Sequence, residues 1–319
     1  MNIPLLERLK RATDAIEFPG GFVPLDRLGA DPADLDELEA FGFRLERHPF
    51  QGVAYRGPSP RLCPDQIEWE LGIRVIGRRI AVWNRVTSTN DLAARAAASV
   101  SNDGLVILAE EQTGGRGSRG RKWSSPAGSS ILMSVLLFPS PEVDDLGWLT
   151  ALGAVAVAEV VSAYDGLDAR IKWPNDVRVE GRKLAGVLVE RGQGTVLGIG
   201  LNVNVAEFPD DLRDSATSLQ RVLGRSLDRS EVARALIRRL DHHHARASEG
   251  GPATLNEPYR RLSEHLGFDV RVATPTGEHA GRLTDLDLGS GLTLVEQDGT
   301  ARLIAGRDAT AIVNVGPRG

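Results

Sequence analysis

The strongest constraint on this chain is a glycine- and arginine-rich stretch at residues 114–125, which lies between two apolar runs. It contains four glycines and four cationic side chains, and Trp123 follows them. Glycine lets a backbone fold closely around an anion, and arginine presents a planar set of donors that matches phosphate and carboxylate oxygens. The runs at residues 105–109 and 130–138 are typical of strands. We therefore predict a strand–loop–strand hairpin with an anion-binding loop, rather than a flexible solvated loop in which Trp123 would have no role.

Two familiar phosphate-binding motifs do not fit this loop. The string Gly115-x-Gly117-x-x-Gly120 matches the dinucleotide fingerprint by letter, but that fingerprint needs a helix that begins at its last glycines. Here Pro126 and Gly128 follow, which break helices, and then the second apolar run. The phosphate loop of ATPases ends in Gly-Lys-Ser/Thr, whereas Gly120 is followed by Arg-Lys-Trp. The loop is therefore an arginine-rich cradle of another kind.

Length and composition narrow the class of protein. The 319 residues are enough for two or three domains, and the net charge of −5 gives no general attraction to nucleic acid or to anionic membranes. A single cysteine, Cys63, excludes an intrachain disulfide and a thiolate metal cluster. No apolar run approaches the roughly 20 residues of a membrane span, and residues 1–10 have the pattern of an amphipathic helix rather than a signal peptide. We expect a cytoplasmic protein with no membrane partner.

Residues 1–60 predict a small winged-helix-like domain. Helical patterns lie at residues 5–12 and 24–28 and from Asp31-Pro32 to Gly42, and residues 43–56 predict a two-stranded wing. The third helix would be the recognition helix, yet it carries five acids and no Lys or Arg, which is a poor surface against phosphates. We therefore expect a packing module without specific DNA binding, followed by a linker at residues 61–79.

Residues 80–267 alternate strand and helix patterns and predict an α+β domain with a central mixed or antiparallel sheet and flanking helices. Besides the hairpin, the expected strands lie at residues 80–85, 171–173, 177–179, 184–190 and 195–205. The expected helices lie at residues 88–98, 146–164, 228–246 and 258–266. From residue 268 to residue 319, short strands and tight turns predict a small all-β barrel.

Three consecutive histidines, His242, His243 and His244, fall in one of these helices. Consecutive helical positions do not share a face, so three neighbouring rings cannot converge on one ion. We interpret them as part of a solvated helix and predict no metal site built from protein side chains.

A second unusual string, Lys172-Trp-Pro-Asn-Asp, presents a cation, an amide and a carboxylate directly after a strand. Pro174 fixes the backbone there, which suits a rigid edge of a site, although a turn with surface charges is an equally good reading of the string alone. Lys183 begins the next apolar strand, and a glycine-rich strand that ends near Asn202 follows.

Taken together, these strings closely resemble biotin–protein ligases. The matching pieces occur in the family's order over about residues 80–316, and the ordered set is highly specific: residues 88–90, 112–123, 172–176, 183–190, 200–202 and 216–219. The resemblance implies a class II synthetase-like ligase core and a C-terminal SH3-like β-barrel. The full-length form of the family adds a winged helix that represses biotin-synthesis genes, and residues 1–60 match that form weakly.

The resemblance implies two chemical steps. The carboxylate of biotin attacks the α-phosphate of ATP and gives biotinyl-AMP and pyrophosphate. A lysine of a biotin carboxyl carrier domain, typically in acetyl-CoA carboxylase, then attacks the mixed anhydride. The first step joins an anion to a polyanion, so cations must offset the repulsion, and Mg²⁺, which the family uses, shares this role. The family also commonly forms homodimers through sheet edges.

The resemblance also implies roles for single residues. Lys183, Arg116 and Asp176 are the expected catalytic set: Lys183 bridges the biotin carboxylate and the α-phosphate, and Asp176 orients the acceptor lysine. The expected binding residues are those for the ureido ring (Ser88, Thr89, Asn90 and Gln112), for the biotin tail and phosphate (Arg116 and Gly117), and for the nucleotide and metal (Arg119, Arg121, Trp123, Lys172, Asn175 and Asn202). Gly115, Ser118, Lys183 and Gly186 complete the expected binding set.

Ser118 departs from the family string Gly-Arg-Gly-Arg-x-Gly-Arg, whose fourth position is an arginine that helps to close the loop over the activated intermediate. A serine hydroxyl cannot make the same bidentate charged contact. Either the enzyme releases biotinyl-AMP more readily, or Arg119 takes over the contact.

Two alternatives stay open at this point. Lipoate–protein ligase shares the core chemistry but lacks the arginine-rich loop in this form. A biotin-sensing repressor without catalysis is the other, and the presence of Lys183 argues against it.

Overall fold

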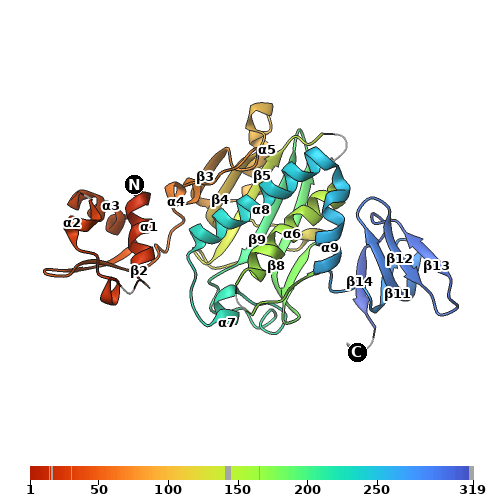
Figure 1. Cartoon of the computed structure of the whole chain (residues 1–319). Helices are drawn as coiled ribbons and strands as arrows, with labels where there is room; N and C mark the ends of the chain where they lie inside the picture. Colours follow the sequence, from red (N-terminus) through yellow and green to blue (C-terminus); the bar gives the residue numbers. More distant parts are fainter. Residues whose placement is uncertain (14, 16, 30, 141–144, 165, 316–319) are drawn as a thin grey trace.

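The computed structural model describes residues 1–13, 15, 17–29, 31–140, 145–164 and 166–315. Three units follow one another along the chain and in space: a small helical unit, a central sheet with its helices, and a C-terminal antiparallel sheet (Figure 1). The fold is therefore α+β, as the sequence predicts.

The N-terminal unit has the three helices and the wing that the sequence predicts. Its elements are α1 (Ile3–Ala12), η1 (Pro19–Gly21), α2 (Leu25–Leu28), α3 (Pro32–Phe41), β1 (Arg44–His48) and β2 (Gly52–Gly57). The Asp31 side chain caps α3 by accepting a hydrogen bond from Ala33 N, and Gly42 ends the helix in a left-handed conformation. Leu6, Leu9 and Leu38 are among the buried side chains of a core that is separate from the main one.

The central sheet has seven strands in the order β3-β4-β5-β9-β8-β7-β6. The first pair is parallel and the others are antiparallel, so the sheet is mixed. Their bounds are β3 (Arg79–Val86), β4 (Leu105–Gln112), β5 (Ser130–Leu137), β6 (Ala169–Lys172), β7 (Asp176–Val179), β8 (Arg182–Arg191) and β9 (Thr195–Asn202). As predicted, β4 and β5 are the antiparallel strands on either side of the glycine-rich loop.

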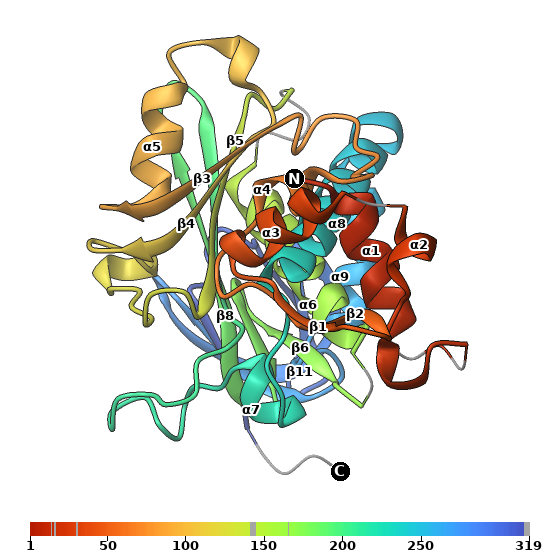
Figure 2. The ribbon, with the colours of Figure 1, turned by 90° about the vertical axis from the view of Figure 1, so that its left-hand side faces the viewer.

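Helices cover both faces of this sheet (Figure 2). One face packs against α6 (Leu146–Ser162), α8 (Arg229–Gly250) and α9 (Asn256–Leu262), and the other carries α5 (Thr89–Ala96). The apolar helix α6 is buried over most of its length. Two predicted ends are corrected: α8 continues to Gly250, and α9 ends at Leu262 because Ser263 adopts an extended conformation. The remaining short elements are η2 (Val100–Asn102), η3 (Ser118–Gly120), α7 (Leu219–Leu223) and η4 (Pro252–Leu255).

The segment expected to be a linker contains a short helix, α4 (Pro64–Glu68). Ile67, Leu71 and Ile76 are buried in the main core, and Gln66 is fully buried. Only Ile67 of these apolar side chains falls within the five-residue helix, which is too little to indicate a helix from sequence, yet the segment packs against α8.

The C-terminal unit is a five-stranded antiparallel sheet in the order β13-β12-β11-β10-β14. Its strands are β10 (Asp269–Thr274), β11 (Gly277–Asp287), β12 (Gly291–Val295), β13 (Ala301–Ile304) and β14 (Ala311–Asn314). Residues 316–319 of the predicted barrel lie outside the described residues. Within the part of the chain that the structure describes, no helix is long and apolar enough to cross a membrane.

The interpretation of the three histidines as a solvated face is wrong for two of them. His243 and His244 are buried on α8, and His243 Nε2 lies 2.8 Å from Glu159 Oε2 of α6. The pair joins two helices of the main core. Its partner Glu159 is 84 positions away, so no local pattern points to it.

Candidate active site

The floor of the main pocket is made of three glycines on two adjacent strands. Gly186 of β8 pairs with Gly200 of β9, and Gly198 lies two residues before Gly200, on the same face of the sheet. A Cβ atom at Gly200 would overlap the ring of Trp123, and one at Gly198 would overlap the Asn90 side chain. Glycine at these positions therefore lets Trp123 and Asn90 lie directly on the sheet.

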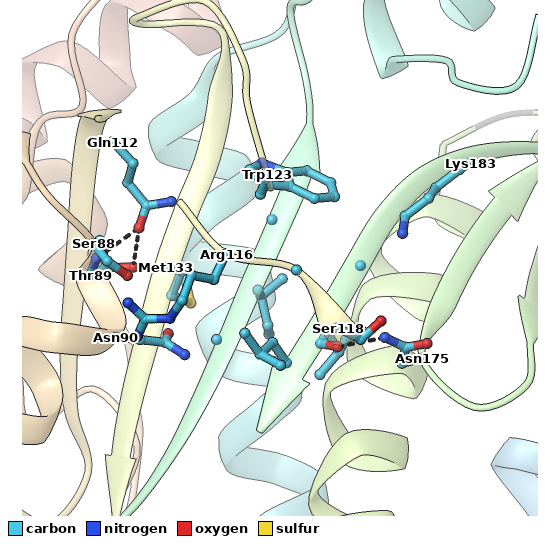
Figure 3. Close-up of a pocket in the computed structure, with 17 residues that line it drawn as sticks. Ser88, Thr89, Asn90, Gln112, Arg116, Ser118, Trp123, Met133, Asn175 and Lys183 are labelled. Atoms are coloured by element: carbon cyan, nitrogen blue, oxygen red, sulfur yellow. Dashed lines mark hydrogen bonds between the residues drawn. The ribbon is translucent and has the colours of Figure 1, made fainter. Parts of the chain in front are cut away.

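One end of the pocket carries a hydrogen-bonded network from α5, β4 and β5 (Figure 3). Gln112 Oε1 accepts hydrogen bonds from Thr89 N at 2.7 Å and from Thr89 Oγ1 at 2.9 Å. Ser134 Oγ lies 2.7 Å from Thr89 Oγ1 and donates to Asn90 Oδ1. Ser88 stands at the N-cap position of α5 but makes no capping hydrogen bond through its side chain. This end is suited to a small polar group that needs both donors and acceptors.

The opposite side of the pocket carries a cation. Lys183 Nζ lies 2.6 Å from Asp176 Oδ1 and 5.7 Å from the centre of the Trp123 ring, and Figure 3 shows it directed into the pocket. The backbone of Lys183 is held on both sides, because its N–H donates to Ser215 O and its carbonyl accepts from Thr217 N. The ammonium is thus fixed by an ion pair, an aromatic ring and an anchored backbone.

Arg116 extends from the glycine-rich loop toward two carboxylates. Its Nε and Nη2 atoms donate to the two oxygens of Glu190, at 3.2 and 3.0 Å, and Nη2 lies 2.8 Å from Asp91 Oδ1. Asn90 Nδ2 also donates to Glu190, at 2.6 Å. Although burial opposes ionisation, the donors of Arg116 and Asn90 hold the pKa of Glu190 below its usual range. The hydrogen bonds that Arg116 donates to Glu190 and, to a smaller extent, to Asp91 raise the pKa of Arg116.

The rest of the loop is stabilised by its own arginines. Arg121 donates from Nη2 to Ser118 Oγ at 3.1 Å and from Nε to Ser118 O at 3.3 Å. Arg119 adopts a left-handed conformation and donates to Thr310 O of the C-terminal unit. It lines a second groove, which also contains Trp173, rather than the main pocket. Ser118 therefore faces the pocket while Arg119 points away from it.

Of three further residues of the expected nucleotide set, only Asn175 lines this pocket. Asn175 Nδ2 donates to Val187 O at 2.9 Å at the edge of the pocket. Lys172 stands on the neighbouring strand β6, and burial, followed by the nearby Arg178, lowers its pKa. Asn202 is buried at the end of β9, where it donates to Thr217 O.

Most of the predicted binding residues converge on this one pocket, and a few do not. Its lining includes Ser88, Thr89, Asn90, Gln112, Arg116, Gly117, Ser118, Trp123, Asn175, Lys183 and Gly186. Outside that lining lie Gly115, Arg119, Arg121, Lys172, Asp176 and Asn202, of which Asp176 reaches the pocket through Lys183. Lining residues that were not predicted are Met133, Val187, Leu188, Gly198, Ile199 and Gly200. Glycine alternates with other residues along β9, and this pattern was the sequence signal that could have identified Gly198 and Gly200.

Comparisons with known proteins point in one direction. Residues 82–205 match the model of the Biotin/lipoate A/B protein ligase family. The chain is 38% identical over 239 residues to the biotin–[acetyl-CoA-carboxylase] ligase of Mycobacterium tuberculosis, which covers 71% of this chain and 89% of the relative. It is 29% identical over 299 residues to the bifunctional ligase/repressor BirA of Bacillus spizizenii, over 90% of this chain and 92% of that protein.

A solved structure agrees with these sequences. The biotin protein ligase from Aquifex aeolicus in complex with biotin and ATP has a TM-score of 0.67 and 27% sequence identity to this chain. The match covers 75% of this chain and 100% of that one.

Proposed function

Because the chain belongs to the biotin–protein ligase family, we propose that the pocket bounded by Trp123 and the glycine floor is where it joins biotin to AMP. The protein is a biotin–[acetyl-CoA-carboxylase] ligase, which activates biotin with ATP and transfers it to a protein lysine. One observation carries the assignment of the site. A fixed ammonium, that of Lys183, shares a pocket with a polar network that is suited to a ureido ring.

The orientation of biotin follows from the two ends of the pocket. A ureido ring offers two N–H donors and one carbonyl acceptor, and Thr89, Asn90 and Gln112 supply matching groups. The tail then crosses the glycine floor, and its carboxylate lies near Lys183. The same residues would bind the ring of the intermediate.

In the first step, a carboxylate oxygen of biotin attacks the α-phosphorus of ATP, and the bond from that phosphorus to the bridging oxygen breaks as pyrophosphate leaves. Lys183 offsets the charge that gathers on the reacting oxygens, and the ion pair with Asp176 keeps the ammonium in place. Trp123 excludes water from one side of the ammonium. In the second step, the amine of the carrier lysine attacks the acyl carbon and AMP leaves, with Asp176 orienting the amine.

Magnesium enters this scheme as the ion bound to the phosphates of ATP. Among the residues that the structure describes, no group of three or more His, Cys, Asp or Glu side chains is arranged to hold a metal ion. A site with few protein ligands fits Mg²⁺, which usually keeps its waters and binds substrate phosphates with one or two protein oxygens. Asn175 Oδ1 is the oxygen that would contact it, because Asn175 Nδ2 is used by Val187 O. When bound, the ion would neutralise phosphate charge.

The partner is the biotin carboxyl carrier domain of acetyl-CoA carboxylase or of a related carboxylase. We place the catalytic domain at residues 80–267, the winged-helix-like domain at 1–60 and the barrel-like domain at 268–319. The linker at 61–79 joins the first two and itself packs against α8 of the catalytic core. A homodimer through sheet edges and a cytoplasmic location belong to the same proposal. The acidic helix α3 is the reason for expecting no specific DNA binding by the N-terminal unit.

The test is incubation with biotin, ATP, Mg²⁺ and a carrier domain, followed by a streptavidin blot. Label on the carrier that depends on both biotin and ATP supports the proposal. A parallel reaction with lipoate in place of biotin tests the lipoate alternative. Lipoylated carrier without biotinylated carrier would reject the proposed substrate.

A further inference from the structure

Glu190 contacts two residues of the pocket that come from different elements of the fold. It stands near the end of β8 and accepts hydrogen bonds from Asn90, on α5, and from Arg116, in the glycine-rich loop. No other side chain described here accepts hydrogen bonds from both residues. We propose that Glu190 is a positioning residue, which orients Asn90 and Arg116 for biotin and so sets the rate of adenylate formation. This inference rests on the proposed function of the pocket.

The geometry at Arg116 gives Glu190 its effect. Two parallel hydrogen bonds to one carboxylate fix the plane of a guanidinium as well as its position. Nε and Nη2 are directed at Glu190, and Nη2 also lies by Asp91, so Nη1 is the nitrogen that these contacts leave for a ligand. Without Glu190, Arg116 keeps only the contact of Nη2 with Asp91, which does not fix the plane of the guanidinium, and the ligand would have to order it.

The geometry at Asn90 adds a second constraint. Its Oδ1 accepts from Ser134 and its Nδ2 donates to Glu190, so the two contacts determine which way the amide faces. A reversed amide would present a donor where the ureido ring needs an acceptor. Glu190 is ionised at neutral pH, because its donors hold its pKa low, and it can therefore act on both partners at once.

The charge of this region suits the uncharged end of the ligand, rather than the phosphate that the resemblance assigns to Arg116. Glu190 and Asp91 place two carboxylates beside one arginine, which would repel a phosphate. The ureido ring carries no charge and meets no such repulsion. The carboxylates therefore favour the orientation in which the ring lies at this end and the biotin carboxylate lies toward Lys183.

The test is a double-mutant cycle on biotin-dependent pyrophosphate release, with kcat and KM for biotin measured separately. Glu190→Gln should lower kcat/KM by about 10- to 100-fold, the usual effect of losing a hydrogen bond to a charged group. In the Arg116→Ala background the same substitution should cost less than about 5-fold, because the main partner is already gone. Equal effects in the two backgrounds would show that Glu190 does not act through Arg116.

Two controls separate positioning from folding. Glu190→Asp keeps the charge and should retain more activity than Glu190→Gln, whereas equal or greater loss would indicate packing and overturn the inference. Glu180→Gln removes a carboxylate from an exposed pair with Arg182 near the same strand and should leave the rates unchanged. If the wild type itself releases no biotin-dependent pyrophosphate, the proposed function fails. If the wild type is active and Glu190→Gln matches it, only this inference fails.

Discussion

At the scale of single residues, Lys183 is the group whose loss should affect chemistry most directly. Lys183→Ala should lower the rate of adenylate formation by about 10²- to 10³-fold, because one preorganised charge contact to the transition state contributes about 3–4 kcal/mol. Pyrophosphate release in a single turnover measures this step. Arg182→Ala, the neighbouring cation outside the pocket, is the matched control. Pyrophosphate release at the wild-type rate by a folded Lys183→Ala variant would end the assignment.

Ser118 carries the second residue-scale prediction. Arg119 donates to Thr310 O and lines another groove, so in this structure it does not replace the missing arginine at position 118. We therefore expect the enzyme to release biotinyl-AMP readily. Ser118→Arg should slow that release by roughly 10- to 100-fold, the value of a hydrogen bond to a charged group, whereas Arg119→Ala should change it little.

Retention of labelled biotinyl-AMP during rapid gel filtration distinguishes the two cases. A strong effect of Arg119→Ala together with no effect of Ser118→Arg would mean that the loop shifts on binding and that Arg119 has taken over. No effect of either substitution would mean that this loop does not retain the intermediate.

At the scale of elements, the glycine floor of β8 and β9 explains why the pocket exists. Gly200→Ala would place a methyl group against the Trp123 ring, and neither the sheet nor the ring can move far. We expect a loss of about 1–3 kcal/mol of stability, as for overpacking in a core, and weaker biotin binding. Calorimetric titration with biotin and thermal unfolding measure both effects. Gly192→Ala, in the turn between the same strands, has room for the methyl group and should change neither.

The strands around the glycine-rich loop were predictable, because a strand that is buried on both faces reads as a mainly apolar run, and β5 is such a run apart from Ser130 and Ser134. Which residues come together to form the site was harder to predict from the sequence. Asn90 and Glu190 are 100 positions apart and meet because β4, β5, β9 and β8 are neighbours in the sheet. That order is a tertiary fact, which no local pattern contains. The buried pair of His243 and Glu159 was missed for the same reason.

At the scale of the whole molecule, the N-terminal unit is fastened to the catalytic core by a small charged cluster. Lys10 Nζ of α1 lies 3.1 Å from Asp228 Oδ2 and 2.9 Å from Glu231 Oε1, at the start of α8. Gln66 donates to the same two oxygens. Arg229, which follows Asp228 in the chain, is buried and donates to Glu110 of β4 and to Ser130 O of β5. The contact therefore reaches the two strands that carry the glycine-rich loop.

This cluster predicts a pH dependence of the docking. Burial alone would raise the pKa of Glu231, but Lys10 and Gln66 hold it below its ordinary value of 4.5. Burial alone would lower the pKa of Lys10, but Asp228 and Glu231 raise it above 10.5. The lowered pKa of Glu231 contributes stability that is fully present above pH 4.5 and is lost as the pH falls through the pKa of the folded state. The raised pKa of Lys10 contributes stability that is fully present below pH 10.5 and is lost as the pH rises through the pKa of the folded state. The docking should therefore hold from about pH 4.5 to 10.5.

Lys10→Ala tests this attachment. It removes the lysine from two partly buried carboxylates and leaves them Gln66, the Ser230 N–H on Asp228 and the more distant Arg234 beside Glu231. We therefore expect a loss of about 1.5–3 kcal/mol of unfolding free energy at pH 7, and a smaller loss of stability on going below pH 4.5 than in the wild type. Denaturant unfolding at several pH values measures both. Arg27→Ala breaks an exposed pair with Glu17 in the same unit and should cost at most about 1 kcal/mol. Equal losses for the two variants would mean that Lys10 contributes no more than a surface charge, and that the N-terminal unit is held to the core by other contacts.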